Sequence, residues 1–413
     1  MMNKCLFLLL LSFLFLFSVS AEAEDLRVVI ASDMHHLSPS LVTDETTLIR
    51  LLRASDGKVT QYSPEIMQTF ISEIEAQRPD AVVLSGDLTL NGAAESHREL
   101  IALMDPLREA GIPVLVIPGN HDSTGTAYRF TEEGVKEIDG LTDAEFIEAY
   151  QDFGYAQAAS RDDVSFSYVW PLSEKNWLLM LDVNANETYG SVRPETLEWI
   201  EGQLQDAQAA GAEVISVTHQ NLLIHYSMFT FGYQINNAGK LMELFKQYGV
   251  RLNLSGHMHL QHIAEKDGIV DIATSALSVW PNQYGVLTIT DEGIVYDTRK
   301  LDMAAWAENE GITDDILLDF DDYSREFFDA VTRDKQLDRL TNSDIPEDAK
   351  AALAEYAALR NRHVFAGTQI TADELEGLMP WQEYLPDSFT ASYMQTETNT
   401  ATTDMNHFSL PRK

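Results

Sequence analysis

Short groups of metal-ligand residues recur along this 413-residue chain, each just after a segment that reads as a β-strand. The strand segments are Val28–Ala31, Ala81–Leu84, Val114–Ile117, Val214–Val217 and, less clearly, Leu252–Leu254. In an open α/β sheet, the loops at the carboxyl ends of neighbouring strands converge on one crevice. Groups scattered over more than two hundred residues can therefore meet around one site.

The groups combine imidazole, carboxylate and amide side chains. They are Asp33–His35, Gly86–Asp87, Gly119–Asp122, Thr218–His219 and Gly256–His259. This mixed nitrogen and oxygen set suits Mn, Fe, Zn or Co rather than a thiolate site. Two divalent ions about 3.5–4 Å apart stabilise both the attacking and the leaving oxygen of a displacement at phosphorus. The pattern therefore predicts a two-metal hydrolase.

Each group taken alone also has a structural explanation. Gly86–Asp87 is a common turn at a strand end, and Thr218–His219 is a weak signal by itself. Gly256–His259 is stronger, because alternation in an extended segment would send both imidazoles the same way. The glycines before the ligands are expected to allow backbone angles that a Cβ resists. The occurrence of all five groups, each after a strand, favours one functional site over five unrelated turns.

The order Asp-x-His, Gly-Asp, Gly-Asn-His-Asp, His and Gly-His-x-His resembles the calcineurin-like metallophosphoesterase family, over about Leu26 to Arg299. The resemblance implies a four-layer α/β/β/α sandwich, with two mixed sheets flanked by helices. It implies a first ion held by Asp33, His35, Asp87 and His259, and a second held by Asn120, His219, His257 and the bridging Asp87. A hydroxide between the ions would be the nucleophile, because bound metal lowers the pKa of water.

The resemblance assigns His121 and Asp122 to the substrate side, and closeness in sequence to the ligand groups adds Asn91, His225 and His262 as weaker candidates. His121 would contact the phosphate or protonate the leaving oxygen, and Asp122 would orient its ring. Asn91 is expected to reach the phosphate or a ligand, and His225 and His262 are expected at the rim of the substrate site.

Two features place the chain nearer the cyclic-nucleotide and glycerophosphodiester phosphodiesterases of that family. Protein phosphatases of the family carry Gly-Asn-His-Glu and Gly-Asp-x-x-Asp-Arg, whereas this chain has Gly119–Asp122 and Gly86–Asn91, without the arginine. Hydrolysis of a phosphodiester is therefore favoured. The alternatives are a phosphomonoesterase or nucleotidase, and a non-catalytic, metal-stabilised binder of a surface phosphopolymer. The His121–Asp122 pair argues against a mere binder, which needs no acid.

Charge and the N-terminal segment constrain partners and location. The formal net charge of −37 repels nucleic-acid backbones, so a small-molecule phosphoester is the expected partner and nucleic acid is not. Residues 1–23 have the basic start, apolar run and Ala-Glu-Ala site of a signal peptide, and the run is too short for a comfortable membrane span. An extracytoplasmic location is expected: periplasmic, cell-surface or secreted. The oligomeric state stays open.

The rest of the chain divides by composition. A catalytic domain is expected over residues 24–301, a helical accessory region over 302–389 and a mobile, Thr- and Ser-rich tail over 390–413. An insertion at about Ser38–Tyr62, without strong periodicity, is expected to overhang the metal crevice. Helices are predicted to begin at the capping residues Ser63 and Ser96.

Overall fold

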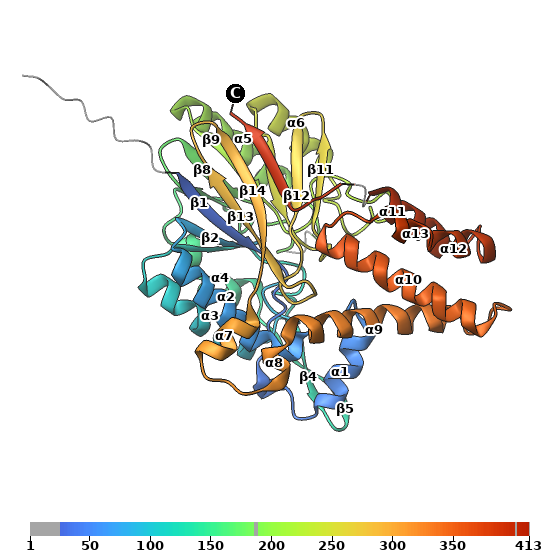
Figure 1. Ribbon diagram of the computed structural model, residues 1–413. Helices are drawn as coiled ribbons and strands as arrows, with labels where there is room; N and C mark the ends of the chain where they lie inside the picture. The colour runs from blue at the N-terminus through green and yellow to red at the C-terminus, as the bar shows by residue number, and fades with distance from the viewer. Residues whose placement is uncertain (1–24, 186–188, 401–402, 413) are drawn as a thin grey trace, which may run out of the picture.

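The computed structural model describes residues 25–185, 189–400 and 403–412 (Figure 1). The predicted signal peptide therefore lies outside the described residues. All five predicted strand segments are strands. They are β1 (Leu26–Ala31), β2 (Ala81–Leu84), β3 (Val114–Val116), β9 (Glu213–Val217) and β10 (Leu252–Ser255). The first three belong to one sheet and the last two to another, so the ligand groups converge from two sheets rather than from one edge of a single sheet.

The two sheets are both mixed. In the first, strands follow the order β15 (His407–Pro411), β14 (Gly293–Lys300), β13 (Gln283–Ile289), β1, β2 and β3. In the second, the order is β11 (His262–Lys266), β12 (Ile269–Ala273), β10, β9, β8 (Asn176–Met180), β7 (Tyr168–Pro171) and β6 (Ser160–Arg161). The pairs β1–β2, β2–β3 and β9–β10 are parallel, so the ligand loops of each sheet leave its strands at the same end.

Helices cover the outer face of each sheet. The helices α2 (Ser63–Gln77) and α3 (Ala94–Glu109) share one apolar core with both sheets, for example Phe70 with Ile30 and Met180. The helices α5 (Pro194–Ala210) and α6 (Ala238–Tyr248) form a second core on the other face of the second sheet, where Phe245 and Leu179 pack. This arrangement confirms the predicted α/β/β/α sandwich.

The insertion after the first ligand group has more regular structure than its sequence suggested. It contains α1 (Glu45–Ala54), whose first amides are capped by the Asp44 carboxylate, and which buries Leu48 and Leu52. Beside it lie the hairpin β4 (Thr126–Thr131) and β5 (Gly134–Asp139), followed by α4 (Asp143–Ala149). A short helix with a good cap and two buried leucines is enough to order such a segment.

The predicted capping roles of two serines are wrong. Helix α2 begins at Ser63 itself with Tyr62 as its cap residue, and α3 begins at Ala94, before Ser96. The serine hydroxyl groups instead accept the backbone amides of Leu37 and Ser38, at 3.0 Å each. Both buried serines therefore fix the chain immediately after the first ligand group.

The C-terminal region is helical, as predicted (Figure 1). Its helices are α7 (Met303–Asn309), α8 (Asp315–Leu318), α9 (Phe320–Leu340), α10 (Glu347–Ala366), α11 (Ala372–Leu375), α12 (Leu378–Tyr384) and α13 (Phe389–Thr400). Its first part packs on the main core through Trp306 and Phe320, whereas the far ends of α9 and α10 form a separate core with α12 and α13 around Trp381. Among the described residues, no helix combines the length and apolar character needed to span a bilayer.

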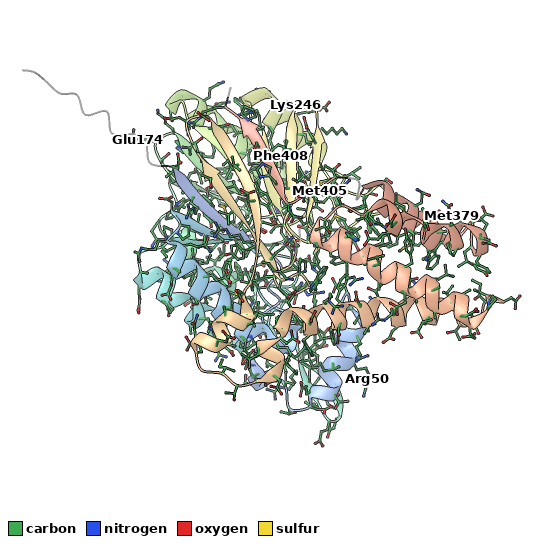
Figure 2. All side chains as sticks on the ribbon, in the orientation of Figure 1. Arg50, Glu174, Lys246, Met379, Met405 and Phe408 are labelled. Atoms are coloured by element: carbon green, nitrogen blue, oxygen red, sulfur yellow. The ribbon has the colours of Figure 1, made fainter. Side chains whose placement is uncertain are left out.

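The segment from residue 390, predicted to be a mobile tail, contains regular structure. Helix α13 occupies its first part, and β15 pairs antiparallel with β14 as the edge strand of the first sheet. Phe408, labelled in Figure 2, lies half-buried on this strand and packs against the main core. Sequence composition missed this strand because its support comes from backbone pairing with a segment more than a hundred residues earlier.

Candidate metal centre

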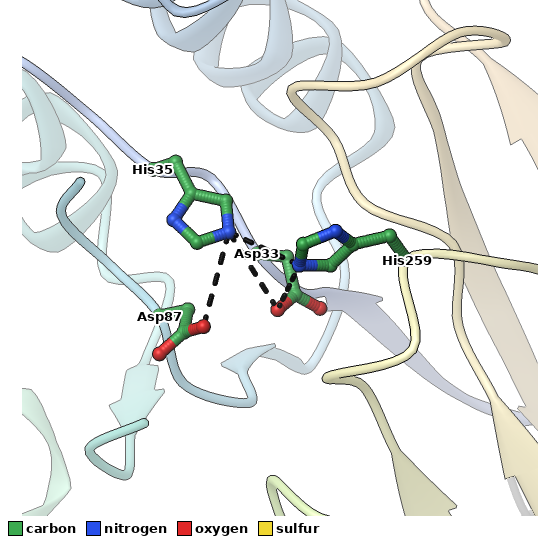
Figure 3. A group of neighbouring side chains, drawn as sticks. All are labelled: Asp33, His35, Asp87 and His259. Carbon is green, nitrogen blue, oxygen red and sulfur yellow. Dashed lines mark hydrogen bonds and ion pairs between the residues drawn. The ribbon is translucent and has the colours of Figure 1, made fainter. Parts of the chain in front are cut away.

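Four of the predicted ligands converge on one point, as Figure 3 shows. This first group consists of Asp33, His35, Asp87 and His259. The Nε2 atoms of His35 and His259 lie 3.1 Å apart, and His259 Nε2 lies 3.3 Å from Asp33 Oδ1. Each of the four residues offers one ligand atom, and these atoms all lie within 4.8 Å of one another. Nitrogen and carboxylate atoms so arranged can surround a single cation.

A second group shares Asp87 with the first. It consists of Asp87, His219, His257 and Asn120. His219 Nε2 lies 3.3 Å from Asp87 Oδ1, 3.2 Å from Asn120 Oδ1 and 3.3 Å from His257 Nδ1. The other carboxylate oxygen of Asp87 faces the first group, 3.8 Å from His35 Nε2. One carboxylate thus presents a different oxygen to each group, which is the geometry of a bridge.

The chemistry of these atoms fits divalent cations. Asp33 Oδ1 is buried and, apart from its ion-pair contact with His259, has no hydrogen-bond partner among the described residues, although a buried carboxylate oxygen normally needs one. His35 and the two carboxylates are buried, and the donor set contains imidazole and carboxylate atoms without a thiolate. Such a set suits Mn, Fe, Zn or Co.

The electrostatics of the two groups are dominated by burial and by the two carboxylates. Burial lowers the pKa of His219, but Asp87 and Asp33 outweigh it and raise that pKa to about 9. His259 likewise reaches a pKa of about 9, because Asp56 and Asp33 overcome its burial. The pKa of Asp87 is well below its usual value, since the neighbouring histidines overcome its desolvation. Without ions, the imidazoles of His219 and His259 are therefore protonated at neutral pH.

Most of the predicted ligands have an unusual backbone. Five of the seven have a positive φ: Asp33 (53°), His35 (43°), Asp87 (48°), His257 (67°) and His259 (59°). Each such residue costs about 1–3 kcal/mol and persists only where the surrounding structure enforces it. Strain concentrated on one set of polar side chains is typical of a functional site.

The expectation of an extended segment at His257 and His259 is wrong. The segment is a loop between β10 and β11, and both residues are left-handed. Their rings consequently diverge, His257 toward His219 and His259 toward Asp33. The loop therefore supplies one ligand to each group.

Only one of the three glycines preceding the ligands needs its backbone freedom. Gly86 has a φ of 100°, as expected. Gly119 and Gly256 have no positive φ; a Cβ on Gly119 would collide with Asp87, and one on Gly256 would collide with Ser32. Their role is close approach between the loops that carry the ligands.

His121 lies beside the ligands and is more open. Its side chain is 42% exposed, and its Nε2 lies 4.0 Å from Asp87 Oδ2. Its Nδ1 donates a hydrogen bond to the carbonyl oxygen of Leu90 at 2.8 Å, which leaves Nε2 facing the centre. This is a position from which a general acid can reach a leaving oxygen.

The predicted role of Asp122 is wrong. The Asp122 carboxylate is buried and accepts the amides of Leu88, Thr89 and Gly119 at 2.8–3.0 Å. Burial raises its pKa to about 6, and the nearby Asp87 adds to this effect. Asp122 therefore holds two ligand loops together, while Leu90 orients the ring of His121.

The comparisons with known proteins agree with this geometry. A sequence profile described as "Calcineurin-like phosphoesterase" matches residues 26–261, more than half of the chain. The chain belongs to this family. A second profile, described as "C-terminal domain of cyclic nucleotide phosphodiesterase", matches residues 302–404. The predictions of the family and of a metal-dependent phosphoester hydrolase are thereby confirmed.

Individual relatives of this calcineurin-like phosphoesterase are distant. A "Probable cyclic nucleotide phosphodiesterase" of Synechococcus sp. is 25% identical over 231 residues, which cover 55% of this chain and 76% of that protein. A glycerophosphodiester phosphodiesterase of Enterobacter lignolyticus is 30% identical over 132 residues, covering 32% of this chain and 38% of that protein. A dimetal phosphatase from Danio rerio superposes with a TM-score of 0.49 at 13% identity, covering 67% of this chain and 96% of the other.

Three weaker site predictions for this phosphoesterase are not supported by the geometry. The amide nitrogen of Asn91 donates to the carbonyl of Tyr128 at 3.1 Å, so Asn91 supports the hairpin. His225 and His262 are buried and face each other, with their Nδ1 atoms 2.8 Å apart. His225 also contacts Asp271 at 3.3 Å. Both histidines are part of a polar core network rather than a substrate rim.

Two residues of the phosphoesterase centre were missed by sequence reasoning. Asp56 contacts the Nδ1 of His259, and Lys58 donates to the same carboxylate at 2.8 Å. The only signals were the turn-like Ser55–Lys58 stretch and its place in an insertion expected to overhang the crevice. Nothing in the local sequence indicates contact with a residue 203 positions later.

Proposed function

We propose that this protein is a dinuclear metal-dependent phosphodiesterase acting on small-molecule phosphoesters. The observation that carries the proposal is the shared carboxylate of Asp87, with one oxygen toward each ligand group. Two divalent ions, when bound, supply an activated water for attack on phosphorus and neutralise the charge that develops there. Asp33, His35, Asp87 and His259 would hold the first ion. Asp87, Asn120, His219 and His257 would hold the second.

The chain's own residues support the leaving-group side of the reaction. With Nδ1 bonded to the carbonyl of Leu90, His121 directs Nε2 toward the centre, where it can donate a proton to the departing oxygen. The partly exposed ring allows this proton to be replaced from solvent.

A cavity of about 320 Å³ adjoins the second group and favours a diester substrate. It is lined by Asn120, Ser123, Thr124, Asp143, Asn184 and Tyr189, among others, and the described residues that line it include no basic side chain. Neutral polar groups and one acid suit the alcohol part of a diester better than additional phosphates. The names of the relatives, a cyclic nucleotide and a glycerophosphodiester phosphodiesterase, agree with this choice.

The test compares an activated diester with an activated monoester. We expect the purified chain, supplied with Mn²⁺, to hydrolyse bis(p-nitrophenyl) phosphate faster than p-nitrophenyl phosphate, and to contain two ions per chain by elemental analysis. Faster hydrolysis of the monoester would instead identify a phosphomonoesterase or nucleotidase. Two bound ions without hydrolysis of either ester would identify a metal-stabilised binding protein.

The proposal includes export. Its support is the signal-peptide pattern of residues 1–23. Intact-mass analysis of the protein recovered from outside the cytoplasm should show a mature chain starting near residue 24. Recovery of the full chain from the cytoplasm would contradict it.

A further inference from the structure

The turn Ser55–Lys58 contacts His259, a ligand of the first group, at the ring nitrogen that faces away from the other ligands. One oxygen of the Asp56 carboxylate accepts a hydrogen bond from His259 Nδ1, and the other accepts one from Lys58 Nζ at 2.8 Å. The opposite nitrogen of the ring, His259 Nε2, faces Asp33 Oδ1 at 3.3 Å. The contact with Asp56 keeps the proton on Nδ1, which leaves the lone pair of Nε2 for a cation. A carboxylate behind a ligating imidazole fixes both its tautomer and its orientation.

Asp56 and Lys58 form a close ion pair in a largely dry environment. Their side chains are 29% and 11% exposed. Desolvation opposes ionisation of Asp56, but Lys58 and His259 more than compensate and hold its pKa well below the usual value. Lys58 is fixed in turn by β-type pairing with Val279, in a segment whose Ser278 hydroxyl donates to the Asp33 carbonyl at 2.8 Å. The turn therefore contacts the first group by two routes.

The far side of the turn is covered by α9 of the helical region. Lys335 Nζ donates to the carbonyl oxygen of Ser55. Phe328 packs so closely on Gly57 that an added Cβ would lie 3.1 Å from its Cα and 3.0 Å from its ring. Gly57 also has a φ of 88°, which a side chain would strain. Helix α9 thus fixes the position and the backbone conformation of the turn.

We propose that Asp56 and Lys58 are positioning residues for the first ion, and that α9 maintains its affinity by holding the Ser55–Lys58 turn. This inference rests on the proposed two-ion function and assigns the helical region a part in it. Asp56 does not touch the reacting atoms; it acts through His259. In the second group, backbone carbonyls take this place instead: His219 Nδ1 hydrogen-bonds to that of Ser85, and His257 Nε2 to that of Gly232.

The test measures ion binding by the full-length chain rather than activity alone. Metal-free protein is titrated with Mn²⁺, and free Mn²⁺ is followed by electron paramagnetic resonance. We expect Asp56→Ala to weaken one of two sites 10–100-fold and to leave the other within about threefold. Asp56→Asn should lie between Asp56→Ala and wild type, because its amide oxygen still accepts the Nδ1 proton. Asp334→Ala is the matched control, since the ion pair of Asp334 with Arg53 is exposed and does not involve the turn.

Variants on α9 test the second half of the inference. Lys335→Met removes the contact to the turn without touching a ligand, so the same site should weaken several-fold. Arg333→Met is its control on the same helix, because Arg333 forms its ion pair with the exposed Glu355 of α10 rather than with the turn. If circular dichroism shows that Asp56→Ala is unfolded, the test uses Asp56→Asn and Lys335→Met instead. If these variants bind both ions with wild-type affinity, the inference is overturned. If the wild-type protein binds fewer than two ions, the proposed function is overturned.

Discussion

The two ligand groups share Asp87 but differ in what surrounds them. In the first group, Asp33 and His35 are fully buried, and Asp56 and α9 support His259 from behind. In the second group, Asn120 is exposed and lines the cavity of about 320 Å³. The first ion would therefore be held in a preformed, enclosed site, and the second would sit where substrate enters. The first group is therefore suited to tight binding of an ion, whereas the second group is accessible to the substrate.

Removing the shared carboxylate should have the largest effect, because it affects both groups at once. Asp87→Ala is expected to lose both ions, or their coupling, and to reduce hydrolysis of an activated diester by at least about a hundredfold. Elemental analysis and steady-state rates measure this. Near-normal activity with two ions still bound would refute the dinuclear assignment. Asp206→Ala, at an exposed position of α5, is a suitable control.

Removing His121, the proposed general acid, should leave both ligand groups intact. His121→Ala is expected to bind two ions and to lose about 10²–10⁴-fold in rate on substrates with poor leaving groups. The loss on nitrophenyl esters should be smaller, because their leaving groups need less protonation. Equal losses on both kinds of ester would mean that His121 positions the phosphate instead.

A matched pair of ligand variants should separate the groups. Asn120→Ala removes a neutral amide from the open group, so we expect one ion to bind about 10–100-fold more weakly while the other is retained. His35→Ala should affect the other ion. Titration of each variant with Mn²⁺ provides the measurement, and weakening of the same site by both would contradict the division into two groups.

The smallest expected effect concerns pH. In the metal-free protein His219 and His259, one in each group, have pKa values raised to about 9, so both rings are protonated at pH 7. Binding of each ion must displace about one proton. Affinity should therefore rise with pH up to about 9, by no more than about tenfold per unit for each proton. Calorimetry in buffers of different ionisation enthalpy counts the protons, and uptake without proton release would contradict the assignment.

Much of the fold was predictable because its signals are local. The five strands were recognisable as apolar segments, and the ligand types after them were sufficient to predict a two-metal hydrolase. The helical region was likewise visible in its composition. In each case the determining physical property, a run of apolar residues or a donor suited to a cation, belongs to the residues themselves.

Other features were not predictable because they depend on distant partners. Ser63 and Ser96 have the sequence of helix caps, yet their hydroxyl groups bind the segment after His35. Asp122 follows His121 directly, yet its carboxylate accepts the amides of Leu88 and Thr89 in another loop and of Gly119 in its own loop. Hydrogen-bonding capacity is a property of the residue, but the nearest available donor is determined only when the chain is packed.

The boundary between core and helical region shows the same limit. A cut near Leu301 follows the composition, but it would remove β15 together with the helices and would expose the edge of β14. It would also release the turn that supports His259. The accessory region is therefore part of the structure of the catalytic domain.

The strands, the family and the candidate ligands could be predicted from the chain alone, because they follow from residue types and their order. Three features become visible only in the folded chain. The ligand groups converge from two sheets, the rings of His257 and His259 point to different groups, and Asp56 contacts the Nδ1 of His259. The reason is geometric: left-handed backbone angles and contacts across two hundred residues are imposed by packing and leave no local signal in the chain.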